Sequence, residues 1–208
     1  MSSQSAPQDS ASSPKATRRR GESLTRAIYL TTLRDLAENG FDKLSFDKIA
    51  SSAGTGKASL YRRWSTPAQL VLAALTDPVS GFGAPAEPNT GSLRSDLVAM
   101  LNSLAGTVAE QPHGRAFLPL ITQRPRNAEL YASVRRLVIE PRRQQFMNVL
   151  RAAVDRGEAD PGAVTPLVAA VGPGLVIQAL MDHDHVSPAE VNAIVDEVLM
   201  PLITAPRR

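Results

Sequence analysis

The sequence predicts an all-α protein in which an N-terminal three-helix domain precedes a larger helical domain. Three observations predict this class. Apolar residues recur at helical spacing in most segments between about residues 22 and 203, and glycine and proline separate those segments. Residues 45–64 also hold two short helical patterns joined by a glycine-containing turn, which is the pattern of a helix-turn-helix.

Composition limits the classes to which the chain can belong. Its 208 residues allow one large domain or two small ones, and 43% hydrophobic residues suffice for a sizeable core. Without cysteine the chain forms neither disulfides nor thiolate metal sites. No stretch approaches about eighteen uninterrupted apolar residues, and the N-terminus lacks the apolar region of a secretory signal. We therefore expect a soluble cytoplasmic protein that contacts no membrane.

The net charge of +3 is unevenly distributed. Residues 1–64 carry 11 Lys and Arg against 6 Asp and Glu, a balance of +5, whereas residues 65–208 have a balance of −2. Every lysine lies at or before Lys57. A basic first part on a slightly acidic remainder indicates a polyanionic partner for the first part only.

The N-terminal domain is expected over residues 21–66, preceded by an arm. Residues 1–20 are predicted to be a disordered basic arm, because they are poor in apolar residues and end in Arg18-Arg19-Arg20. These arginines fit either a solvated charge run or an arm that reaches a phosphate backbone, and the sequence leaves both open. The first helix is expected from about Glu22 to Asn39, where Asn39 and Gly40 end it.

The motif of residues 45–64 opens on Ser45, whose hydroxyl can cap the first turn of a helix. Apolar residues then follow at positions i, i+3, i+4 and i+7 and form one stripe: Phe46, Ile49, Ala50 and Ala53. Gly54 is expected to end this helix, since glycine readily adopts the left-handed conformation. A second helix is expected to open at Lys57.

In the second helix, Leu60 and Trp64 are expected to face inward. The opposite face carries cations and small polar groups, which suits a DNA major groove lined by phosphates. The alternative is an ordinary helical hairpin whose basic residues form a solvated face.

The segment resembles the DNA-binding half of the TetR family of one-component transcriptional repressors. The matching stretches are residues 36–41, 45–50 and 53–61, followed by the aromatic Trp64, and together they cover about a quarter of the chain. Beyond them the resemblance is one of helix pattern only.

The resemblance implies that the Tyr61 hydroxyl contacts a phosphate and that residues 55–59 lie nearest the bases. The candidates for DNA contact are Ser45, Lys48, Thr55, Gly56, Lys57, Ala58, Ser59, Tyr61, Arg62 and Arg63.

The segment after the motif departs from the family pattern. Many family members open the next helix with a Ser-Lys pair whose lysine contacts phosphate, whereas this chain reads Ser65-Thr66-Pro67-Ala68. Thr66 can cap a helix and Pro67 fits its first position, so a linking helix is expected over residues 67–76. The lysine contact is lost, and Arg62 or Arg63 is expected to substitute for it.

Residues 77–208 are expected to form a C-terminal ligand-binding and dimerisation domain that begins with a loop over residues 77–91. Helices are expected over about residues 92–110, 115–123, 128–156, 162–181 and 188–203, with a break at Pro112-His113-Gly114, a kink near Pro141 and a cap at Ser187. The resemblance implies that the last two helices pair with their copies across a two-fold axis. The alternative is that both are core helices of a monomer.

Two other kinds of chemistry were weighed. Residues 182–185, Asp-His-Asp-His, could bind a divalent metal, but four consecutive residues cannot easily face one ion, so we expect neither a metal site nor a cofactor. No nucleophile elbow, phosphate loop or HExxH pattern occurs, so we do not expect an enzyme.

Apolar residues of the middle helices could line a pocket for a hydrophobic or aromatic small molecule, or could be plain packing, and the sequence does not separate the two. These residues are Leu97, Leu101, Leu104, Phe117, Leu120, Ile121, Tyr131, Phe146 and Met147.

The residues and the resemblance together predict a TetR-type one-component transcriptional regulator. We expect a repressor that binds a palindromic double-stranded DNA operator as a homodimer and is released by a small apolar ligand. The alternative is a helical protein-interaction module that uses the basic helix of residues 57–63 as a docking face.

Overall fold

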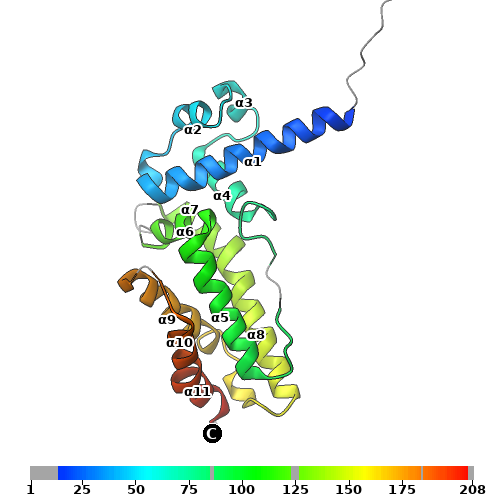
Figure 1. Cartoon of the computed structure of the whole chain (residues 1–208), viewed down its shortest axis with the longest axis vertical. Helices are drawn as coiled ribbons and strands as arrows, with labels where there is room; N and C mark the ends of the chain where they lie inside the picture. The colour runs from blue at the N-terminus through cyan, green and yellow to red at the C-terminus, as the bar shows by residue number, and fades with distance from the viewer. Residues whose placement is uncertain (1–13, 85–86, 123–126, 184, 206–208) are drawn as a thin grey trace, which may run out of the picture.

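The computed structural model describes residues 14–84, 87–122, 127–183 and 185–205, and every regular element within them is helical (Figure 1), which confirms the predicted all-α class. The N-terminal elements are α1 (Pro14–Asn39), η1 (Phe41–Lys43), α2 (Phe46–Ser52), α3 (Lys57–Tyr61) and α4 (Pro67–Thr76). The later elements are α5 (Leu93–Glu110), α6 (Pro112–Thr122), α7 (Ala128–Val134), η3 (Arg135–Ile139), α8 (Glu140–Asp155), η4 (Pro161–Ala163), α9 (Val168–His183), α10 (Pro188–Ala193), η5 (Ile194–Leu199) and α11 (Met200–Thr204).

Helix α1 begins earlier than the sequence predicted. It starts at Pro14 rather than near Glu22, so residues 14–20 of the expected disordered arm are helical. Proline suits the first turn of a helix, and each residue added to a helix that has already nucleated gains a hydrogen bond at little cost for Ala, Lys and Arg. Residues 1–13 of the expected arm lie outside the described residues.

Side-chain caps begin helices where the sequence predicted them. The Ser45 hydroxyl accepts from the Lys48 N–H, and the Thr66 hydroxyl accepts from the Gln69 N–H. At the start of α10, Ser187 and Glu190 form a reciprocal capping box. Each cap satisfies backbone donors that have no partner inside the helix, so these helix starts follow from the local sequence.

Prolines act differently from the expectation at one site. The predicted break after Glu110 is present but shorter than expected, because only Gln111 separates α5 from α6. Pro112 to Gly114 form the first turn of α6, where the N–H that proline lacks would have no partner inside the helix. The expected interruption near Pro141 is present as a π-helical turn, η3, which ends at Ile139. A second π-helical turn, η5, precedes Pro201 in the same way.

The buried apolar side chains form two clusters. The first joins α1–α4 to α6, α7 and η3, and it includes Phe117, Leu120 and Leu130. The second joins α5 and α8 to the C-terminal helices α9–α11. In Figure 1, α2 and α3 lie at one end of the molecule and the C-terminus lies at the other. The two cores therefore do not divide at residue 77, because α6 and α7 return to pack against the N-terminal helices.

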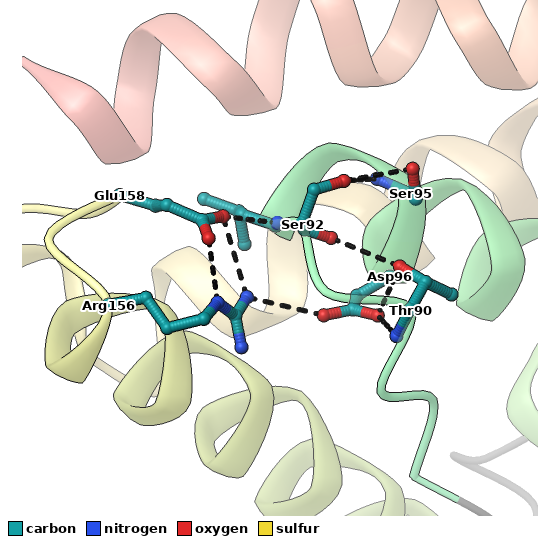
Figure 2. A network of polar contacts seen from close by, with 7 residues as sticks. Thr90, Ser92, Ser95, Asp96, Arg156 and Glu158 are labelled. Atoms are coloured by element: carbon teal, nitrogen blue, oxygen red, sulfur yellow. Dashed lines mark hydrogen bonds and ion pairs between the residues drawn. The ribbon is translucent and has the colours of Figure 1, made fainter.

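A polar network joins the start of α5 to the end of α8 (Figure 2). Asp96 is 1% exposed, and its carboxylate accepts from the Thr90 N–H at 2.7 Å, the Thr90 hydroxyl at 2.8 Å and the Arg156 guanidinium at 3.4 Å. The neighbouring Glu158 carboxylate accepts from Arg156 and from the Leu93 N–H. These bonds lower the pKa of Glu158, and the bond to Arg156 contributes most.

A second junction lies where residues 77–82 meet α6 and α8. The Phe82 ring packs against His113 and Phe117, with centroids 4.7 and 5.5 Å away, and the Arg142 guanidinium lies 4.6 Å from its centroid. Arg142 also donates to the Phe82 and Val138 carbonyls. Burial lowers the pKa of His113, the Arg142 charge lowers it further, and a backbone hydrogen bond with Ser80 partly offsets both.

We expect His113 to make the fold less stable as the pH falls below about 6.5, the ordinary histidine pKa. The pKa of His113 is lower in the folded state than in the unfolded state. As the pH falls from the unfolded-state pKa toward the folded-state pKa, the unfolded state binds more protons and is favoured. Urea unfolding at pH about 7.5 and about 5.5 measures this loss. The free energy of unfolding should fall less between the two pH values in His113→Gln than in wild type. His185→Gln, which changes an exposed histidine, should keep the wild-type loss. Equal losses in all three proteins would contradict this role.

Candidate nucleic-acid interface

The turn between α2 and α3 is set by local backbone chemistry. Helix α2 ends at Ser52, and Gly54 follows with a φ of 65°, in the left-handed region that favours glycine. The Thr55 N–H then donates to the Ala50 carbonyl at 2.9 Å. Helix α3 begins at Lys57, as the sequence predicted.

One face of this helix pair enters the first core. Phe46, Ile49 and Ala50 of α2 are buried, as are Leu60 of α3 and Trp64 after it. The inward positions predicted for Leu60 and Trp64 are therefore confirmed. Trp64 also packs against Tyr29 of α1, with ring centroids 5.8 Å apart.

The opposite face presents most of the predicted DNA-contacting residues to solvent. The structure brings the ten candidates together on α2, the turn, α3 and the residues that flank this helix pair. Seven of them are exposed and three are half-buried. The exposed residues are Lys48, Gly56, Lys57, Ala58, Tyr61, Arg62 and Arg63, and the half-buried ones are Ser45, Thr55 and Ser59.

The Tyr61 ring is anchored while much of its surface stays open. It packs against the Phe46 ring in a T-shaped arrangement with centroids 4.8 Å apart, yet the residue is 55% exposed. This contact restricts the ring without enclosing it. The arrangement is compatible with a hydroxyl that reaches a ligand outside the protein.

Two cations have protein partners that the sequence did not indicate. Lys57 forms an ion pair with Asp47 of α2 at 2.8 Å, and this hydrogen bond is the main cause of a raised Lys57 pKa. Arg63 donates to the Thr25 hydroxyl of α1 at 2.6 Å and lies 6.0 Å from the Trp64 ring centroid. Arg63 is therefore tied to α1 in this structure, and Arg62 is the freer candidate to replace the missing lysine of α4.

The nine candidate ligand-binding residues are not brought together. Phe117, Leu120 and Ile121 belong to the first core, whereas Leu97, Leu101, Leu104, Phe146 and Met147 belong to the second. Tyr131 borders a small hollow beside Leu120. A larger groove of about 680 Å³ lies between α1, the α5–α6 junction and α9, and none of the nine lines it. Their ligand-binding role stays a prediction.

Among the described residues, no three His, Asp or Glu side chains gather as metal ligands would, and Asp184 of the sequence lies outside this set. The helices of the described ranges are also too short or too polar for any of them to cross a lipid bilayer.

An exposed cationic helix, set by a tight turn on a capped partner helix, is how helix-turn-helix proteins present a recognition helix to DNA. This helix pair, together with the second helical core of the chain, defines the class of helix-turn-helix transcriptional regulators. The chain belongs to the TetR family: residues 28–74 match the model of the bacterial regulatory proteins, tetR family, and residues 87–198 match the tetracyclin repressor-like C-terminal domain.

Individual relatives agree with this assignment. The chain is 33% identical to an uncharacterized HTH-type transcriptional regulator of Mycobacterium tuberculosis, over 85% of this chain and 86% of that one. It is 31% identical to a DNA-binding transcriptional repressor TetR of Mycobacteroides abscessus, over 88% and 96%.

Solved structures share the fold. A TetR family transcription regulator, SCO0332, superposes with a TM-score of 0.59 at 26% identity, over 85% of this chain and 96% of that chain. The TetR regulator TylP of Streptomyces fradiae superposes with a TM-score of 0.67 at 18% identity, over 90% and 89%.

Proposed function

We propose that this cytoplasmic regulator is a repressor that binds a palindromic operator as a homodimer. The observation that carries the proposal is the exposed cationic α3, whose inward residues are buried while Lys57, Tyr61 and Arg62 stay open. Phosphate contacts from Tyr61 and Arg62 would position the helix, and a few side chains would read bases. The relative of M. abscessus named a DNA-binding transcriptional repressor supports the direction of regulation.

Exposed apolar side chains support the homodimer. Leu167 is 78% exposed just before α9, and Leu175, Met181 and Val198 are also exposed on α9 and η5. Two-fold symmetry would place two copies of α3 in successive major grooves, about 34–36 Å apart.

Selection of bound duplexes from a random DNA pool tests the proposal. We expect an enriched palindrome with half-sites spaced by about one helical turn, and an affinity that falls linearly with the logarithm of salt concentration. If no sequence is enriched and salt has little effect, α3 is a protein-docking face and the repressor proposal fails.

Residues of α3, of the turn before it and of its C-terminal cap should divide into two functional groups. Tyr61→Phe and Arg62→Ala should weaken binding to every sequence alike, because each removes a phosphate contact. Arg62→Ala should also make the salt slope shallower by about 1, whereas Tyr61→Phe should leave the slope unchanged because a phenol is neutral. Changes at Thr55 or Ser59 should instead alter the preferred bases, by about 1–3 kcal/mol per lost contact. Phenylalanine keeps the ring on Phe46, so Tyr61→Phe tests the hydroxyl alone. Uniform loss in both groups, measured by binding to the selected site and its mismatches, would contradict this division.

A small hydrophobic effector would release the operator by a population shift. Helix α4 and helix α6 share the first core with α1, so a rearrangement of the C-terminal helices could reach α3 through α4. This requires a ligand that binds one conformation better than the other. Operator affinity measured against a panel of hydrophobic compounds tests it. If bound compounds leave operator affinity unchanged, the effector proposal fails.

A further inference from the structure

The first residue of α3 is held by a carboxylate of α2. Lys57 Nζ lies 2.8 Å from the Asp47 carboxylate. The same ammonium group lies 5.8 Å from the centroid of the Tyr61 ring, which packs against the Phe46 ring in a T-shaped arrangement. Asp47 occupies the first turn of α2, where the helix dipole favours a negative charge. Lys57 is therefore directed by two groups that belong to the same exposed surface.

This ion pair is open to exchange. The Lys57 side chain is 47% exposed and the Asp47 side chain 68% exposed. Exposed ion pairs contribute little to stability, so another acceptor can replace the carboxylate at low cost. A DNA phosphate that takes the place of the carboxylate on Lys57 must approach Asp47, and the phosphate and Asp47 are both negatively charged. A neutral acceptor on a base edge meets no such repulsion.

We propose that Asp47 is a specificity-determining residue: it directs Lys57 toward base edges and penalises contact between Lys57 and the phosphates of arbitrary DNA. The proposal rests on the proposed function, since it requires α3 to meet DNA. In the free protein the carboxylate neutralises the charge at the start of α3. The pair then favours duplexes that offer a neutral acceptor where Lys57 points.

Asp47→Asn tests the proposal, because it removes the charge and keeps the size of the side chain. The probes are the palindromic duplex selected by the wild-type protein and a scrambled duplex of the same length and composition. We expect the variant to bind the scrambled duplex about 3- to 10-fold more tightly. The salt slope for that duplex should steepen by about 0.9, because Lys57 then releases one more counterion. Affinity for the selected duplex should change by less than about twofold, so the ratio of the two affinities falls.

The control is Asp47→Asn made in a protein that lacks the Lys57 ammonium group. In the Lys57→Gln background, Asp47→Asn should leave the ratio of affinities unchanged within about twofold, because the double-mutant cycle isolates the pair. An equal gain for both duplexes, or the same change of ratio in both backgrounds, would show a general charge effect and overturn the proposal. Unchanged binding in Asp47→Asn would overturn it as well.

Failure of the inference and failure of the proposed function give different results. If the wild-type protein enriches a palindrome but the cycle shows no coupling, only the role of Asp47 is wrong. If the wild-type protein enriches no sequence, both are wrong. Thermal unfolding of each variant confirms that it is folded, and little change is expected because both side chains are exposed.

Discussion

Gly114→Ala is expected to destabilise the protein by at least about 3 kcal/mol, because it forces an atom into the backbone of a neighbouring helix. A Cβ at residue 114 would lie 2.0 Å from the Thr107 carbonyl oxygen and 2.5 Å from the Val108 Cα. These are backbone atoms of α5 and cannot move aside as a flexible side chain can. Helix α6 would have to leave α5, although it also packs against α1 in the first core.

Gly106→Ala is the matched control for this prediction. Residue 106 lies inside α5, and a Cβ there meets no atom within 4 Å. Alanine is favoured over glycine in a helix by about 0.8–1 kcal/mol, so this variant should be slightly more stable than wild type. Both changes restrict the unfolded chain alike, so their difference isolates the packing of α6 on α5.

Urea unfolding at one protein concentration gives the free energy of unfolding of both variants, and thermal unfolding gives their Tm. In a chain of this length each kcal/mol shifts the Tm by about 2–4 °C, so Gly114→Ala should melt roughly 6–12 °C lower than wild type. If the two variants prove equally stable, α5 and α6 do not approach as closely as described.

Removal of the Asp96 carboxylate has the second large expected effect. Asp96→Ala should lower the free energy of unfolding by about 2–3 kcal/mol, because it removes a buried carboxylate that accepts three hydrogen bonds from the exposed residues Thr90 and Arg156. The Thr90 N–H loses its acceptor, the Thr90 hydroxyl keeps only the Ser92 carbonyl at 3.3 Å, and Arg156 keeps only Glu158 (Figure 2). The connection between the start of α5 and the end of α8 would be broken at its buried member.

Two further variants separate this effect from a general loss of charge. Asp96→Asn keeps a carbonyl oxygen for Thr90, so it should cost less than Asp96→Ala. Asp196→Ala removes an exposed carboxylate that pairs with Arg94 at 2.7 Å, and it should change stability little. The measurement is urea unfolding of the three variants beside wild type. Equal losses of stability for Asp96→Ala and Asp196→Ala would show that the network of Asp96 contributes no more than an exposed ion pair.

Much of the secondary structure could be predicted because its causes are local. Ser45, Thr66 and Ser187 cap their helices within three residues, and Gly54 turns the chain after α2 through its own positive φ. The inward faces of α2 and α3 followed from helical spacing alone. The start of α1 was missed because residues 14–20 have no apolar stripe, and only continuation of an existing helix makes them helical.

The assignment of helices to cores could not be predicted from such signals. Helices α5 and α6 follow each other along the chain, yet they belong to different clusters. An amphipathic pattern shows that a helix has a buried face and does not show which helix covers that face. The sequence left open whether the nine candidate ligand-binding residues line a pocket or are plain packing. Eight of them are divided between the two cores, and their ligand-binding role stays a prediction.

The sequence by itself determined where most helices begin and end and which helix carries the cations of the recognition motif. It did so because caps, glycine turns and helical periodicity act over a few residues. The tertiary structure alone decided that Lys57 meets Asp47, that Arg63 meets Thr25 and that Asp96 meets Arg156. These partners lie 10, 38 and 60 residues apart, and such pairs form only when separate helices pack against one another.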